Sequence, residues 1–203
     1  MTSTIKISAK PNTDIWRKPP NINAFNAPFT PLARRPLPTF TSAQLTLTFL
    51  PTTQYDQAGL LLTFHPPSSS SQEPTALPWI KTGVELYNGS PRLSTVACPQ
   101  WADWSVAPLL DPLNEGKEGV VKTTIRVERM IDHHGPSLWV YAVNKDGGKE
   151  SLREVCWVFA LGKEDEGKGD WEVEVSAMAA RPAGDEALGE LEAEFTGIEV
   201  NWD

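Results

Sequence analysis

Two runs of alternating apolar and polar residues flank an Asn-Gly pair between residues 79 and 96, and this pattern constrains the fold more than any other stretch. Asn-Gly is typical of a two-residue β-hairpin turn, because both residues readily adopt positive φ angles. We therefore predict two antiparallel strands joined by a tight turn. Successive side chains of a strand point to opposite faces. One face of the first strand is then core-like and carries Ile80, Val84 and Leu86.

The other face of this first strand has a different composition and carries Trp79, Lys81, Gly83, Glu85 and Tyr87. Two aromatic rings, a cation, a carboxylate and a glycine that permits close approach to the backbone are typical of a sugar-binding groove. The alternative is an ordinary outer face on which Lys81 and Glu85 pair with charges of neighbouring strands. The residues alone leave both interpretations open.

Similar alternation recurs along the whole chain and predicts about ten to twelve strands with little helix. It is clearest at residues 43–50 and 120–130, and further strands are predicted near residues 3–9, 55–64, 138–143, 171–178 and 191–202. The nearly continuous apolar run at 153–159 predicts a central strand buried on both faces. Turns at this spacing favour an all-β sandwich of two antiparallel sheets.

Three segments differ from this alternation. Residues 11–40 are rich in proline but contain many apolar anchors, so we expect an ordered segment that wraps around the sandwich. Residues 66–78 combine prolines with four consecutive serines and predict a flexible surface loop. Residues 99–118 are expected to form a loop, from which Trp104 reaches the groove only by folding over its rim. The length of 203 residues fits a single domain over 1–203.

The charge balance limits the classes of partner. A formal net charge of -8 at pH 7 disfavours nucleic acid and anionic membranes, which require an excess of lysine and arginine. The first residues lack the apolar core of a signal peptide, and no run approaches the roughly 20 apolar residues that cross a bilayer. We therefore expect an intracellular protein that binds neutral ligands or other proteins.

Neither the cysteines nor the histidines indicate a reactive or metal site. Cys98 and Cys156 both lie in apolar runs, so we expect buried, reduced thiols. His133 and His134 are adjacent, but only His65 is found elsewhere, which does not supply a set of metal ligands. No metal and no cofactor is predicted.

Several motifs together resemble one family. The stretches that carry the resemblance, in order along the chain, are Tyr55-Asp-Gln-Ala-Gly59, Trp79-Ile-Lys-Thr-Gly-Val-Glu85, Leu93-Ser-Thr-Val96, Asp103-Trp-Ser105 and Ile125-Arg-Val-Glu-Arg129. They resemble the DUF1349 family. Thr13-Asp-Ile-Trp16 and Arg153-Glu-Val-Cys-Trp-Val-Phe159 are similar to its fungal branch, which is named for a yeast regulator of enolase.

The resemblance implies a concanavalin A-like jelly roll, a sandwich of two curved antiparallel sheets. Relatives of this fold bind or cleave glycans in a groove on the concave sheet. The resemblance also implies a cytoplasmic protein linked to the regulation of carbohydrate metabolism. It brings no catalytic residues, because none is assigned in the family.

The alternation of side chains between the two faces of a strand places a set of polar and aromatic side chains away from the core. We predict that they converge on the concave face as ligand-binding residues: Tyr55, Gln57, Trp79, Lys81, Glu85, Trp104, Arg126, Glu128 and Trp139. The aromatic rings would stack on a sugar ring while the charged groups bind its hydroxyls. Alternatively, Lys81, Glu85, Arg126 and Glu128 form a cross-strand charge ladder.

Catalysis receives no support from carboxylate spacing. Glycoside hydrolysis needs two carboxyl groups about 5 to 9.5 Å apart, a separation that residues i and i+2 on one strand face provide. The strand at 79–87 has only one carboxylate, Glu85, on the groove face. The closely spaced acids Glu172 and Glu174, and Glu190, Glu192 and Glu194, are expected to lie on a solvated outer face. No catalytic residue is therefore predicted.

Three hypotheses about function follow. The first is a lectin-like protein that binds a glycan or a small sugar metabolite. The second is a regulatory module that binds a protein, such as a metabolic enzyme, in the same groove. The third is a glycoside hydrolase or lyase that acts there.

Overall fold

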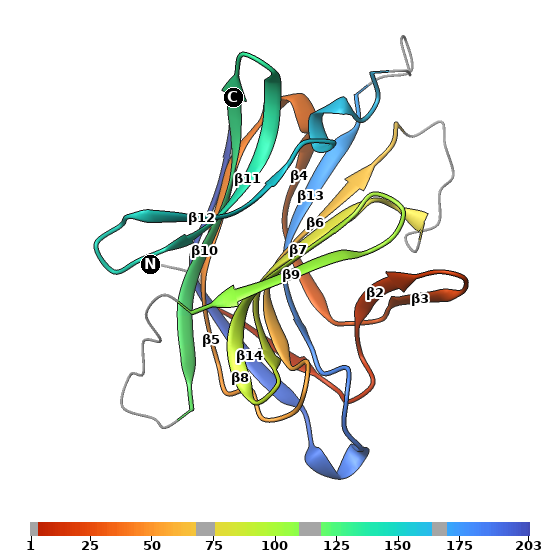
Figure 1. Ribbon diagram of the computed structural model, residues 1–203, viewed down its shortest axis with the longest axis vertical. Coiled ribbons are helices and arrows are strands. Elements are labelled where there is room, and N and C mark those ends of the chain that lie inside the picture. The colour runs from red at the N-terminus through yellow and green to blue at the C-terminus, as the bar shows by residue number, and fades with distance from the viewer. Residues whose placement is uncertain (1–3, 68–75, 110–118, 164–169) are drawn as a thin grey trace.

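Two six-stranded antiparallel sheets form the protein. The structure is a computed structural model that describes residues 4–67, 76–109, 119–163 and 170–203. In spatial order, the first sheet contains β1 (Ile5–Ala9), β14 (Leu191–Trp202), β5 (Phe40–Phe49), β10 (Val121–Asp132), β11 (Gly135–Val143) and β12 (Lys149–Val155). The second contains β4 (Phe29–Pro36), β13 (Glu172–Ala180), β6 (Gln57–His65), β7 (Trp79–Tyr87), β8 (Ser90–Cys98) and β9 (Asp103–Pro108). Figure 1 shows both sheets.

The main hydrophobic core lies between the two sheets. Leu45 and Leu47 of β5 are fully buried, as are Leu60 and Leu62 of β6, while the residues between them on β5 face outward. Burying an apolar side chain of this size contributes about 1.5 to 3 kcal/mol. The prediction of an all-β, concanavalin A-like sandwich of two antiparallel sheets is confirmed. Short 3-10 turns include η1 (Leu37–Thr39), η3 (Val158–Ala160) and η4 (Glu186–Leu188), and no helix of the described chain is long and apolar enough to cross a membrane.

The predicted hairpin at 79–96 is present as β7 and β8. Its last paired residues are Tyr87 and Ser90, which leaves a two-residue turn at Asn88 and Gly89. Both turn residues have positive φ, 51° and 73°. This matches the twist that a two-residue hairpin turn requires.

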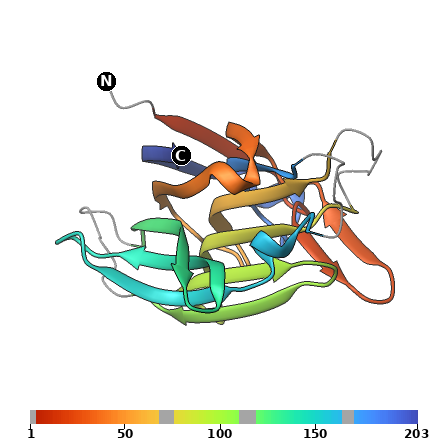
Figure 2. The ribbon, with the colours of Figure 1, turned by 90° about the horizontal axis from the view of Figure 1, so that it is seen from above.

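A small hairpin packs against the outer face of the second sheet. It consists of β2 (Ile15–Lys18) and β3 (Ile22–Phe25), which pair only with each other among the described strands. Figure 1 and Figure 2 show it on the side of the second sheet that faces away from the first. The hairpin buries a second, smaller apolar cluster, whose buried members are Ile15, Ala27, Leu61, Trp79, Val96, Cys98, Met178 and Ala180. Residues 11–40, predicted to wrap around the sandwich, thus supply this hairpin and the edge strand β4.

Gly59 and Gly83 form a directly opposed pair on β6 and β7. A Cβ atom at Gly83 would lie 2.0 Å from the carbonyl oxygen of Ala58, and one at Gly59 would lie 2.0 Å from that of Thr82. The two backbones therefore approach so closely that only glycine fits at either position. The glycine expected to admit a ligand serves instead to bring two strands together.

The apolar run at 153–159 does not form the predicted central strand. Strand β12 ends at Val155 and lies at the edge of the first sheet, and the chain then turns into η3. The run is apolar because the turn sends Val155 and Val158 into the core from two different elements. Cys156 lies between them at the turn and is exposed, so the prediction of a buried thiol is wrong for this residue and holds for Cys98.

Two predicted loops also have different outcomes. Within 99–118, residues 103–108 form the edge strand β9, and residues 110–118 lie outside the described part of the chain. The alternating stretch of β9 is short and lies between Pro99 and Pro108, which explains why the sequence pattern did not indicate a strand here. Of the predicted flexible loop at 66–78, residues 68–75 lie outside the described residues.

Candidate ligand-binding site

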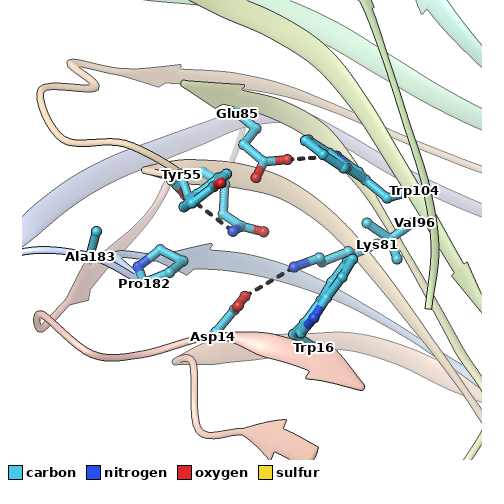
Figure 3. Close-up of a pocket in the computed structure, with 10 residues that line it drawn as sticks. Asp14, Trp16, Tyr55, Lys81, Glu85, Val96, Trp104, Pro182 and Ala183 are labelled. Carbon is cyan, nitrogen blue, oxygen red and sulfur yellow. Dashed lines mark hydrogen bonds and ion pairs between the residues drawn. The ribbon is translucent and has the colours of Figure 1, made fainter. Parts of the chain in front are cut away.

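A cavity of about 420 Å³ lies on the outer face of the second sheet. Its base is formed by side chains of β6, β7 and β8, and its walls come from β9, from the segment that enters β2 and from the loop after β13. Figure 3 shows how these segments surround it. The residues that line it are Asp14, Trp16, Tyr55, Gln57, Lys81, Glu85, Val96, Trp104, Pro182 and Ala183.

Lys81 stands at the centre of the base. Its side chain is only 7% exposed, and its Nζ lies 3.1 Å from Oδ1 of Asp14, as the dashed line in Figure 3 marks. The ammonium also lies 5.8 Å from the ring centroid of Trp16 and 5.9 Å from that of Trp79. A charge this buried requires a partner, so the ion pair to Asp14 ties the β2 segment to the sheet and leaves further Lys81 protons for a ligand.

Glu85 is the second buried charge of the base. Its Oε2 accepts hydrogen bonds from Ser94 Oγ at 2.8 Å and from Trp104 Nε1 at 3.0 Å. Burial raises the pKa of the Glu85 carboxyl above its ordinary value, although Lys81 and these two donors oppose the shift. Within the described chain, Oε1 makes no hydrogen bond, so one carboxylate oxygen remains available as an acceptor.

An aromatic wall stands beside Glu85. The rings of Tyr55 and Tyr87 are stacked with centroids 6.2 Å apart, and Tyr87 meets Trp104 edge to face at 4.9 Å. Tyr55 has a positive φ of 70° and remains 38% exposed. Next to it, Gln57 Nε2 donates to the backbone oxygen of Tyr55 at 3.2 Å, which orients the amide. The wall thus offers ring faces next to fixed polar groups.

A buried ion pair holds the two loops that complete the cavity. Arg181 donates to both carboxylate oxygens of Asp56, at 2.9 Å and 2.8 Å, and both side chains are nearly inaccessible. Asp56 also accepts from the backbone N–H groups of Thr52 and Thr53, and Arg181 donates to the carbonyl oxygen of Gly189. Because Asp56 lies between Tyr55 and Gln57 and Arg181 precedes Pro182, the pair fixes the positions of lining residues on both loops.

Five of the nine predicted ligand-binding residues meet at this cavity: Tyr55, Gln57, Lys81, Glu85 and Trp104. Trp104 reaches it from strand β9, opposite Val96 of β8, and not from a loop folded over a rim. Trp79 points to the same side of the sheet but is fully buried under the β2–β3 hairpin, where its ring lies beside Lys81. It supports the site without lining the cavity.

The other three predicted residues lie on the first sheet. Arg126 and Glu128 of β10 pair with each other at 2.9 Å, and Glu128 also pairs with Lys149 at 2.9 Å. Trp139 of β11 stacks on Tyr141. The predicted convergence, and with it the charge ladder to Lys81 and Glu85, is wrong for these residues. Alternation along a strand shows that a side chain points away from the core. However, each sheet of a sandwich has its own outer face, and alternation does not show on which of the two outer faces the side chain lies.

Half of the cavity's lining was not predicted: Asp14, Trp16, Val96, Pro182 and Ala183. A signal existed for Asp14 and Trp16, since both belong to the Thr13–Trp16 stretch that carries the family resemblance. Val96 shares its strand face with Ser94 by parity. Pro182 and Ala183 are placed by the Arg181–Asp56 pair, which no local pattern reveals. Among the described residues, no group of three or more His, Cys, Asp or Glu side chains is arranged to hold a metal ion.

The sequence pattern of one family matches almost the entire chain. This family is described as "Protein of unknown function (DUF1349)", and the match covers residues 1–202. The chain belongs to this family. A relative from Emericella nidulans, Uncharacterized protein AN7484, is 35% identical over 192 residues, which cover 95% of this chain and 83% of the relative.

Solved structures resemble this DUF1349 chain in fold. A functionally unknown protein from Saccharomyces cerevisiae superimposes with a TM-score of 0.67 at 19% identity, over 98% of this chain and 88% of that one. Rv0315, a pseudo beta-1,3-glucanase of Mycobacterium tuberculosis, gives a TM-score of 0.45 at 16% identity, over 85% and 67% of the two chains. The first similarity extends over nearly the whole sandwich, and at 19% identity it concerns the fold alone.

The cavity of this DUF1349 protein contains two carboxylates, where the sequence indicated one. Asp14 joins Glu85 from a different segment, and it contributes to the raised pKa of the Glu85 carboxyl. Asp14 Oδ1 already accepts from the Ile15 N–H at 2.7 Å as well as from Lys81. With Asp14, Glu85 and Lys81 all ionised, these three side chains carry one net negative charge. The cavity therefore offers a ligand mainly hydrogen-bond acceptors, together with one cation that is already paired with Asp14.

Proposed function

We propose that this DUF1349 protein binds a neutral carbohydrate or a similar polyhydroxylated metabolite in the cavity on its second sheet. The observation that carries the proposal is the arrangement around Glu85, where a buried carboxylate with one free oxygen lies beside the ring of Trp104. A sugar presents hydroxyl groups at its edge and C–H groups on its face. Glu85 and Lys81 suit the edge, while an aromatic ring suits the face.

The charges favour a neutral ligand over a phosphorylated or acidic one. Lys81 is the cation that lines the cavity, and Asp14 already neutralises it at 3.1 Å. An anionic ligand would have to approach Asp14 and Glu85 together, and like charges in a partly buried site repel strongly. Hydroxyl groups, in contrast, donate well to free carboxylate oxygens.

The proposal assigns binding rather than hydrolysis. One oxygen of each carboxylate is held by fixed donors: Lys81 and a backbone N–H bind Oδ1 of Asp14, and Ser94 and Trp104 bind Oε2 of Glu85. Such groups orient a ligand. The resemblance to the fungal branch of the family, which is named for a yeast regulator of enolase, supports a role in which the sugar-bound protein takes part in the cytoplasmic regulation of carbohydrate metabolism, through contact with a metabolic enzyme.

A glycan array combined with a panel of free monosaccharides identifies the sugar, and calorimetric titration of variants tests the site. Trp104→Ala removes an aromatic surface and a donor to Glu85, and it should weaken binding by about 1 to 3 kcal/mol. Trp139→Ala is the matched control, because it removes a tryptophan from the outer face of the other sheet, and it should leave affinity unchanged. Equal affinity in wild type and Trp104→Ala, with intact melting temperatures, would place the site elsewhere.

A further inference from the structure

The outer face of the second sheet is only partly open. Strands β7 and β8 carry Lys81, Glu85 and Val96 into the cavity, but the same face also carries Trp79 and Cys98 nearer one end of these strands. Both Trp79 and Cys98 are 0% exposed, and they belong to the apolar cluster that the β2–β3 hairpin covers. The hairpin therefore occupies the part of the sheet face that would continue the cavity.

Hydrogen bonds attach the hairpin to both β7 and β8 at the open end of this strand pair. The Arg17 guanidinium is buried and donates to the carbonyl oxygens of Leu77, at 3.1 Å, and Gln100, at 3.4 Å. Leu77 precedes β7 and Gln100 follows β8, and because Trp79 pairs with Cys98, both lie at the open end of this antiparallel pair, so a single side chain links the hairpin to both strands there. The N–H of Ala102 donates to the Arg17 carbonyl at 2.9 Å. These bonds make the hairpin a fixed wall.

The remaining sides of the cavity are closed by equally fixed groups. Tyr55 stacks on Tyr87 at the opposite end of β7, and Trp104 stands on the edge strand β9. Pro182 and Ala183 stand on the side of β13, next to the Arg181–Asp56 pair. The cavity of about 420 Å³ is thus a pocket with walls on four sides, near the lower end of the range of small-ligand pockets, about 300 to 1,000 Å³.

From this enclosure we infer that the pocket accepts one sugar unit, either free or at the end of a chain, and excludes an internal segment of a polysaccharide. The inference rests on the proposed function, because it specifies the size of the ligand at the same site. An internal segment would have to leave the pocket in two directions, and one of these is blocked by the hairpin. A terminal unit needs only one exit.

A length series tests the inference. The probes are the methyl glycosides of glucose, galactose, mannose and xylose and the linear tetrasaccharides built from each unit, titrated calorimetrically into the full chain. A tetrasaccharide should bind within about threefold of its own monosaccharide, because only one unit enters. An affinity at least tenfold tighter for the tetrasaccharide would overturn the inference and leave the proposed function intact. Absence of binding by every probe in both sets would overturn both.

Labelling of Cys98 tests whether the hairpin stays in place. In a Cys156→Ser background, the rate of Cys98 alkylation reports the opening of the hairpin, since the thiol is buried beneath it. The rate should be the same with and without the tetrasaccharide that binds best. Faster labelling in its presence would show that the hairpin moves aside to admit a chain and would overturn the inference. Arg17→Ala, which removes the bonds to Leu77 and Gln100, is the positive control for opening.

Discussion

Glu85 combines burial with an unfilled acceptor position, and this combination makes it sensitive to pH. Burial raises its pKa above the ordinary value of 4.5, so the folded protein holds this proton more tightly than the unfolded chain. The stability that protonation contributes is fully present below 4.5 and is lost as pH rises through the raised pKa. At neutral pH the ionised Glu85 carboxylate therefore lowers the stability of the folded protein.

We predict that Glu85→Gln removes this pH dependence. The glutamine amide oxygen still accepts from Ser94 and Trp104, so the fold should persist. As pH falls from 7 through the window above 4.5, the melting temperature of the wild type should rise relative to that of the variant. Thermal melts of both proteins across this range measure the difference. A difference that stays constant with pH would show that Glu85 titrates normally.

The two thiols differ in their surroundings and should differ in reactivity. Burial raises the pKa of the Cys98 thiol to about 11, even though Arg17 and Lys81 oppose the shift, whereas Cys156 is exposed at a turn. Since the thiolate is the reactive form, we predict fast alkylation of Cys156 and slow alkylation of Cys98 at pH 8. Intact-mass measurement should show one label on the folded protein and two after denaturation. Two rapid labels on the folded protein would contradict the burial of Cys98.

At the scale of the elements, the local sequence predicted where the strands lie, but it did not predict which sheet each strand joins. Alternation of apolar and polar residues located β5, β7, β8 and β10, because successive side chains of a strand point to opposite faces. Burial alternates along β5 and β10, whereas most of β7 and β8 is buried on both faces. The partner of a strand, however, depends on contacts between distant parts of the chain. Strand β10 pairs with β5 and β11 in the first sheet, and this pairing carries Arg126 and Glu128 away from Lys81.

The hairpin of β2 and β3 shows the same limit for the site. The apolar anchors of residues 11–40 indicated an ordered segment, but nothing local indicates which surface it covers. Its position depends on Arg17, whose partners Leu77 and Gln100 are 60 and 83 residues away in sequence. The sequence therefore predicted five of the lining residues. Asp14 and Trp16 lie in a stretch that carries the family resemblance, but only this long-range packing places them at the cavity.

At the scale of the whole molecule, the described residues form two apolar clusters of unequal size, one on each side of the second sheet. The larger lies between the sheets and includes residues of both, such as Leu45 of β5 and Leu60 of β6. The smaller lies under the β2–β3 hairpin and can be exposed without disturbing the first, because the hairpin strands pair only with each other in the described chain. Regions with fewer buried contacts open at lower free energy than the main core.

We predict from this arrangement that the hairpin opens before the sandwich unfolds. Hydrogen exchange should be faster for amides of residues 15–25 than for amides of β5. Arg17→Ala removes the donor of the buried hydrogen bond to the Leu77 carbonyl oxygen, which costs about 1 to 3 kcal/mol, and should accelerate exchange in the hairpin alone. Arg126→Ala is the matched control, since it removes an arginine from the outer face of the first sheet. If β5 and the hairpin exchange at one common rate in wild type and both variants, the two clusters unfold as one cooperative unit, and the hairpin is as permanent a part of the pocket as the strands beneath it.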